Sequence, residues 1–173
     1  IGDVEVAVRR TFYANLERGS IFAAGAAIVA PTGKESTGLG SGFWTYEPFA
    51  MWGQIIGTSG FLQVHTGLEI PSDQTLGRNE AFVRTALGYT LAQNRGFGRA
   101  WTPMLEILAA KPTGGPTEWD AVPQVQVSLS KLQHVLLNVG VRVPLNERDE
   151  RKPQALTYVL WDWFDGGLFK FWR

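Results

Sequence analysis

The chain has 173 residues, enough for one domain with its own hydrophobic core, so we expect residues 1–173 to form a single domain. Its 16 basic and 16 acidic residues balance, so no basic surface indicates nucleic acid or an anionic membrane surface as a partner. The absence of cysteine excludes disulfides, thiolate metal sites and thiol nucleophiles.

The composition favours a membrane protein of one particular kind. Charged residues make up only 18% of the chain, against about 25% in an ordinary soluble domain, while aromatic residues reach 12% and include seven tryptophans. No run of 18 or more apolar residues occurs, so a helix that spans the bilayer is excluded. A membrane protein of this composition would have to cross with strands.

Apolar and polar residues alternate with a period of two along most of the chain, and helical spacing is almost absent. The alternation predicts nine strands, over residues 3–13, 20–30, 43–55, 60–70, 80–92, 101–110, 122–130, 133–143 and 154–164. These strands are long, because strands of globular sheets usually have about five or six residues. Strands that cross a membrane need about nine to eleven, so the lengths favour a transmembrane sheet.

The connections between these strands alternate in length. ANLERGS, GTSG, QNRGFGR and SKLQ are short, while PTGKESTGLGSG, PSDQTLGRN, KPTGGPTEWDA and PLNERDERKP are longer and more polar. A proline marks each passage into a long loop, at Pro31, Pro71, Pro112 and Pro144, where its missing N–H ends strand pairing without wasting a donor. This layout predicts an all-β fold, an antiparallel up-and-down transmembrane β-barrel with a meander topology.

The two faces of the strands differ in chemistry, most clearly between residues 122 and 144. There Val125, Val127 and Leu129 alternate with glutamines and serines. Across the chain, one face collects valine, leucine and aromatic side chains with almost no charge. The other carries acids, arginines, amides and glycines but is short of lysine, which usually dominates a sheet face in water. We therefore assign the apolar face to lipid and the polar face to the lumen.

The candidate lumen-lining residues are the charged and hydrogen-bonding side chains of the polar face. They are Glu5, Arg9, Gln63, His65, Glu69, Glu80, Arg84, Glu106, Gln124, Gln126, Asn138, Arg142 and Asp162. In a narrow barrel these groups would form a closed ion-pair ladder that fills the interior. In a wider barrel they would line a channel and tune its selectivity.

The tryptophans provide a second line of evidence. Trp44, Trp52, Trp101, Trp161 and Trp163 fall near the ends of predicted strands, where an indole keeps its ring in hydrocarbon and its N–H at the head groups, so we assign them to the membrane interface. Trp119 is expected in a loop instead. The alternative interpretation makes these residues core aromatics of a soluble sheet.

Pro48 and the number of predicted strands do not fit a complete regular barrel. Pro48 falls inside the third predicted strand and requires a bulge, a later strand start or an unpaired position. Outer-membrane chains begin in the periplasm and bacterial barrels have an even number of strands. If the first short turn is periplasmic, an odd number of strands precedes the nine, so we expect at least one further N-terminal strand and 10–12 in the full protein. The alternative is that GLFKFWR at 167–173 contributes to the barrel.

Four segments resemble a known family of membrane barrels. They are RRTFYANLERGSIFAAGAAIVAPTG at 9–33, EPFAMWGQ at 47–54, FVRTALGYTLAQNRGFGRAWTPMLEILA at 82–109 and LTYVLWDWFDGGLF at 156–169. The sequence resembles the outer-membrane β-barrel proteins of the transporter-like family named for the meta-cleavage pathway of phenol degradation. The resemblance covers most of the chain but has loose hairpin patterns as its motifs. It implies a membrane barrel that passes small, often aromatic or hydrophobic, compounds, and it carries no catalytic residues.

Catalysis and metal binding find little support. His134 follows Ser128 and Ser130 across a short turn, but a histidine and a serine become hairpin neighbours by chance too often to indicate a hydrolase. His65 and His134 are the only histidines, so no metal-ligand spacing exists. GLGSG at 38–42 precedes no predicted helix and is a flexible loop rather than a phosphate site. We expect neither an enzyme nor a cofactor.

These observations lead to one functional prediction and two alternatives. The prediction is a barrel in the bacterial outer membrane that acts as a passive channel or transporter for a small-molecule permeant, with the lipid bilayer as its surroundings. The first alternative is a structural barrel, closed inside, that anchors or sheathes a partner protein in an outer-membrane complex. The second is a soluble lipocalin-like binding barrel whose apolar face turns inward.

Overall fold

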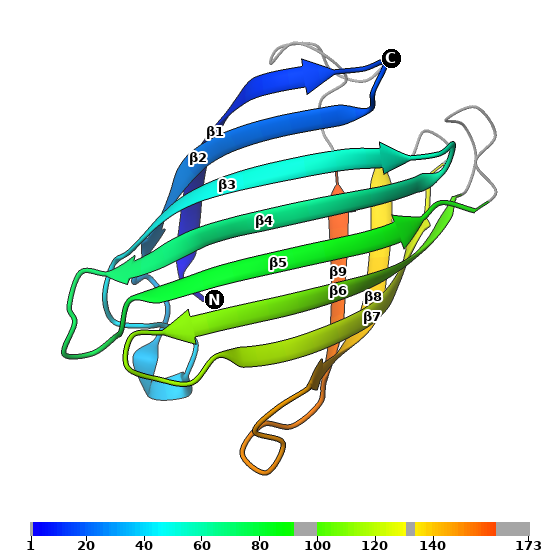
Figure 1. Ribbon diagram of the computed structural model, residues 1–173. Coiled ribbons are helices and arrows are strands. Elements are labelled where there is room, and N and C mark those ends of the chain that lie inside the picture. The colour runs from blue at the N-terminus through cyan, green and yellow to red at the C-terminus, as the bar shows by residue number, and fades with distance from the viewer. Residues whose placement is uncertain (1, 92–99, 131–133, 162–173) are drawn as a thin grey trace.

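The computed structural model describes residues 2–91, 100–130 and 134–161 and shows one antiparallel sheet (Figure 1). Its nine strands pair in chain order, each with the next, so the predicted meander is confirmed. The strands are β1 Val4–Asn15, β2 Ser20–Ala30, β3 Thr45–Ile56, β4 Gly60–Pro71, β5 Glu80–Tyr89, β6 Trp101–Pro112, β7 Glu118–Ser128, β8 Val135–Pro144 and β9 Gln154–Trp161.

The sheet is strongly curved. In Figure 1 the strands β3 to β6 form the near wall, and β8 and β9 lie behind them. Strands β1 and β9 are the two edges, and they do not pair with each other within the described residues, so the sheet is not closed there. The structure therefore shows a barrel-like meander with a concave and a convex face.

The connections sort by length as expected, with one correction. Tight turns at residues 16–19 and 57–59 lie at one end of the strands, and the loops at 31–44, 72–79 and 145–153 lie at the other. The third long loop in chain order, between β6 and β7, is shorter than predicted, because β6 continues to Pro112 and β7 begins at Glu118. Trp119 therefore lies in β7 and not in a loop, opposite Ala109 of β6. The strand itself was predicted, but its start was placed at residue 122 because GGPTE suggested a longer turn.

Pro48 lies inside β3 and is unpaired on one side only, toward β4. It pairs with Ala26 of β2, but the recorded pairing of β3 with β4 passes from Tyr46–Ile70 directly to Phe49–Gly67. The two strands keep the same register on both sides of this gap. Of the three expected solutions, a bulge, a later strand start or an unpaired position, the structure shows the unpaired position.

The loop between β2 and β3 is tied to the start of β1 by one carboxylate. Asp3 accepts hydrogen bonds from the Gly33 N–H at 2.8 Å and from the N–H and hydroxyl of Ser41, both at 2.8 Å. These bonds hold the pKa of Asp3 below its ordinary value of 3.8, led by the one from the Ser41 backbone. This tie is present at neutral pH and is lost as the pH falls through the lowered pKa.

Among the described residues, helical structure is confined to one turn in that loop. The 3-10 helix η1 spans Glu35–Thr37 and ends at Gly38, whose φ of 70° suits a residue without Cβ. Within the described residues, no helix is long and apolar enough to cross a membrane.

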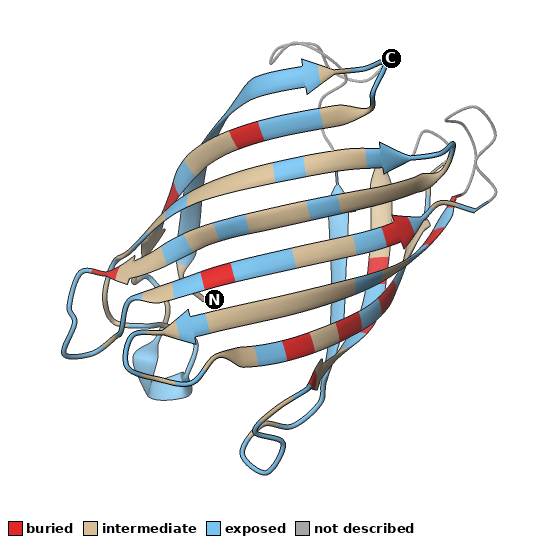
Figure 2. Ribbon diagram, in the orientation of Figure 1, coloured by how far each residue is buried: buried red, intermediate tan, exposed pale blue. Residues whose placement is uncertain are grey.

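The burial pattern distinguishes the two faces of the sheet (Figure 2). The buried strand residues alternate with exposed ones, and by register they lie on the polar face; they include Ala23, Ala27, Phe82, Thr102, Asp120, Val122, Gln124, Ser128 and Asn138. The opposite face exposes large apolar side chains, among them Val6, Val8, Leu68, Leu87, Leu105, Val139 and Val159. The apolar face is thus the exposed, convex one, and the polar face is the concave one.

Candidate functional site

The concave face collects the predicted lumen residues. Antiparallel pairing places His65 beside Arg84, Glu69 beside Glu80, and Gln126 beside Asn138. Alternation along each strand then places the others on the same side as these pairs: Glu5, Arg9, Gln63, Glu106, Gln124 and Arg142. Asp162 lies outside the described residues.

Three further acids share this face and were not predicted. Glu47 pairs with Ala27 of β2 and precedes Phe49 on the concave side of β3, and Glu118 and Asp120 lie on the concave side of β7. Glu47 was missed because the neighbouring Pro48 obscured the alternation. The two acids of β7 were missed with the start of the strand, although the spacing of Glu118, Asp120 and Val122 continues the period of two.

Two phenylalanines enclose His65 near the centre of the concave face. The His65 ring meets Phe49 edge-on at 5.2 Å and Phe82 at 5.1 Å between centroids. The guanidinium of Arg84 lies 4.4 Å from the Phe82 centroid, which is a cation–π distance. The buried Nε2 atom of His65 has no hydrogen-bond partner within the described residues. We call the part of the concave face between this cluster and the long loops the loop side, and the part between the cluster and the tight turns the turn side.

Glycines make room for these rings. Along one cross-strand row the order is Gly25, Phe49, Gly67, Phe82, so each ring has a residue without a side chain next to it. A Cβ on Gly67 would lie 2.7 Å from the tip of the Phe82 ring and 2.7 Å from the carbonyl oxygen of Pro48. The alternation of glycine and phenylalanine therefore covers the sheet with rings that lie flat on it.

We expect Gly67→Ala to lower the free energy of unfolding by about 1–3 kcal/mol, because the Pro48 carbonyl cannot move away without distorting the sheet. Gly53→Ala is the matched control, since its only close neighbour is the Ile21 methyl group at 3.0 Å. Urea titration of the refolded protein measures both. Equal effects of the two substitutions would contradict the close approach of the Pro48 carbonyl and the Phe82 ring to Gly67.

A buried carboxylate connects the loop between β8 and β9 to the wall. Asp120, only 2% exposed, accepts a hydrogen bond from Arg142 Nε at 2.9 Å and also pairs with Arg151. Arg151 lies in the loop and reaches Glu118 as well, at 3.3 Å. Asn146 of the same loop accepts the Trp119 N–H at 2.9 Å. These contacts hold the loop against the first residues of β7.

The loop side of the concave face is rich in acids. Glu69 and Glu80 are cross-strand neighbours, and Glu47 lies on the adjacent strand on the same side. Only Arg84 pairs with this group, through a single contact to Glu69 at 3.4 Å. The acids are thus only partly neutralised by basic groups of the described residues.

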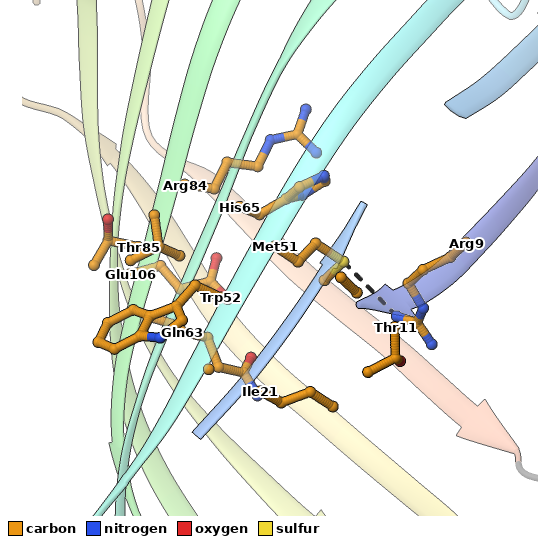
Figure 3. A pocket seen from close by; sticks show the side chains of 14 residues that line it. Arg9, Thr11, Ile21, Met51, Trp52, Gln63, His65, Arg84, Thr85 and Glu106 are labelled. Atoms are coloured by element: carbon orange, nitrogen blue, oxygen red, sulfur yellow. Dashed lines mark hydrogen bonds between the residues drawn. The ribbon is translucent and has the colours of Figure 1, made fainter. Parts of the chain in front are cut away.

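The turn side holds a pocket of about 380 Å³ (Figure 3), a size typical of small-molecule sites. Its polar lining residues are Arg9, Thr11, Gln63, His65, Arg84, Thr85 and Glu106, and its apolar ones include Ile21, Ala23 and Met51. In Figure 3 the Arg84, His65 and Met51 side chains project to one side of the sheet, while Trp52 projects to the other. The pocket therefore opens on the concave face.

A second, more polar pocket of about 310 Å³ adjoins it. Its wall includes Thr90, Thr102, Gln126 and Tyr158, and it shares Gln63, Ala86 and Glu106 with the first pocket. The linings of the two pockets together extend along the turn side from β1 to β9.

The predicted interface tryptophans are exposed. Trp101 and Trp161 stand at the turn-side ends of β6 and β9, each 51% exposed, and Trp52 lies on the turn-side half of β3. Trp44 lies just before β3 at the loop side, where Trp119 is also exposed. Trp163 lies outside the described residues. Two groups of tryptophans thus stand near the two ends of the strands.

No group of three or more metal-ligating side chains occurs in the described part of the chain. No family model, curated protein or solved structure matches the sequence. The chemistry of the faces therefore carries the functional argument.

Proposed function

We propose that the protein is an outer-membrane β-barrel of a bacterium that passes small molecules passively through its lumen, without catalysis. One observation carries the proposal: the exposed convex face is apolar, and the concave face is polar. Soluble monomers rarely expose a contiguous apolar patch larger than a few hundred Å². Large apolar side chains exposed on β1, β4, β5, β6, β8 and β9 favour hydrocarbon as the surroundings.

Strand length and aromatic placement support the same proposal. Eight of the strands, β1 to β8, have 10–12 residues, enough to cross a bilayer core with tilt. The exposed tryptophans near both strand ends match the aromatic girdles of membrane barrels. Loops gathered at one end and turns at the other match the usual layout of these barrels.

The soluble lipocalin-like alternative requires the opposite curvature. Its apolar face would have to be concave to bind a ligand and form a core, whereas side chains such as Val8 and Val159 are 74% and 60% exposed. The hollow turn side favours a passage over a lumen filled with ion pairs. The resemblance to a transporter-like family agrees with this proposal and remains a prediction.

Fractionation and electrophoresis test the membrane proposal first. We expect the protein in the outer-membrane fraction, with a band whose mobility changes between unheated and boiled samples because a closed barrel resists the detergent. Planar-bilayer recording then tests the passage, and we expect stepwise conductance. A soluble protein with one unchanging band would contradict the membrane proposal. A heat-modifiable protein without conductance would support the structural barrel instead.

A further inference from the structure

The pocket on the turn side of the concave face contains two charges of opposite sign that form no ion pair with any other described residue. Within the described residues Arg9 forms no ion pair, and its recorded side-chain contact is a 3.7 Å hydrogen bond to the weak acceptor Met51 Sδ. Glu106, half-buried on β6, has no basic partner there either. Arg84, the third charged residue of the wall, already pairs with Glu69.

Arg9 and Glu106 come from distant strands, β1 and β6, yet line the same hollow. They do not neutralise each other directly, since the ion pairs of the described residues do not include this one. The wall between them carries the apolar side chains of Ala23, Met51 and Ala86, together with the polar ones of Gln63, His65 and Arg84. The pocket thus presents a cation and an anion with an apolar strip over Ala23 and Met51 beside polar groups.

The charges of a ligand decide which molecules fit this wall. A simple organic anion would satisfy Arg9 but face the unpaired Glu106, and a simple amine would satisfy Glu106 but face Arg9. Charge-assisted hydrogen bonds are about twice as strong as neutral ones, so each of these unpaired charges favours a ligand group of the opposite charge. A molecule with both charges gives each group its counter-charge.

We propose that the pocket binds a small zwitterion, a carboxylate and an ammonium group joined by a short apolar chain. The carboxylate binds the Arg9 guanidinium, which suits the planar two-oxygen geometry. The ammonium binds the Glu106 carboxylate, and the methylene chain covers Met51 and Ala23. The inference rests on the proposed function, because such a ligand would be a permeant of the same lumen.

Isothermal titration calorimetry on the full chain, refolded in a nonionic detergent, tests this with three probes of matched length: 6-aminohexanoate, hexanoate and hexylamine. We expect 6-aminohexanoate to bind about tenfold more tightly than either singly charged probe, as two charge-assisted contacts predict. Equal binding of the three probes, or no binding of 6-aminohexanoate, would overturn the proposal.

Substitutions separate recognition from loss of folding. We expect Arg9→Gln to reverse the preference toward hexylamine and Glu106→Gln to reverse it toward hexanoate. A misfolded variant would lose all three probes and could not produce such opposite reversals. Arg10→Gln is the matched control, because Arg10 lies on the convex face, with its guanidinium 5.7 Å from the Phe12 ring. A loss in Arg10→Gln equal to that in Arg9→Gln would also overturn the proposal.

The outcomes for this site and for the proposed function are distinguishable. A heat-modifiable, conducting barrel that does not prefer 6-aminohexanoate overturns the zwitterion site alone. A protein that neither enters the membrane nor conducts overturns the proposed function, whichever probe it binds.

Discussion

Asp120→Ala is expected to lower the free energy of unfolding by about 3–5 kcal/mol, the range observed when one partner of a buried ion pair is removed. Asp120 is 2% exposed and is the shared acceptor of Arg142 and Arg151. Without it, two guanidinium groups remain in a partly buried position, and of the ion pairs among the described residues Arg151 keeps only the one with Glu118. The cost comes mainly from these stranded cations.

Urea titration of the refolded protein, followed by tryptophan fluorescence, measures this change. Asp149→Ala is the control, since Asp149 lies exposed in the same loop. We expect the control to change stability by no more than about 0.5 kcal/mol. The loop also loses its tie to β7 in Asp120→Ala, so proteases should cut residues 145–153 faster than in the control. A loss below about 1 kcal/mol would mean that solvent screens the cluster.

Val83→Arg is expected to lower stability by about 2–4 kcal/mol in lipid vesicles, the cost of an arginine on the lipid face near the middle of a membrane. Val83 lies in the interior of β5 on the convex face and is 43% exposed. In water the same change on an exposed strand position would cost little, because an arginine side chain is well solvated. The substitution therefore distinguishes hydrocarbon from water around this face.

Leu76→Arg is the matched control for this experiment. Leu76 is an apolar residue of the loop between β4 and β5, 66% exposed and outside the strands. We expect a change within about 0.5 kcal/mol there. Refolding into vesicles with a urea gradient measures both variants. Similar small effects at Val83 and Leu76 would argue that the convex face meets water and would remove the main support for a membrane barrel.

The order of the strands and the two faces could be predicted from local pattern. Alternation with a period of two places successive side chains on opposite faces whatever the partners are, so the polar and apolar faces follow from spacing alone. The prolines that end β4, β6 and β8 mark their boundaries for an equally local reason, since a residue without N–H cannot extend the ladder. The pattern failed in two places beside turn-forming residues. It missed the start of β7 at Glu118, and beside Pro48 it missed that Glu47 lies on the polar face.

The pairing of charges across the site could not be predicted in this way. Asp120, Arg142 and Arg151 come from β7, β8 and a loop, and their contact depends on strand register and on the path of residues 145–153. The position of Arg9 near Met51 depends likewise on how far a long side chain reaches over β2. Neither distance is encoded in the spacing of any single strand.

The sequence by itself determined that the chain forms a long-stranded meander with one polar and one apolar face, because pleat geometry and proline chemistry act within a few residues. Only the tertiary structure decided that the polar face is concave and hollow on its turn side, and that the acids gather at its loop side. It also decided that Phe49 and Phe82 lie over glycines around His65. These features arise from sheet curvature and cross-strand register, which bring together residues far apart in the chain.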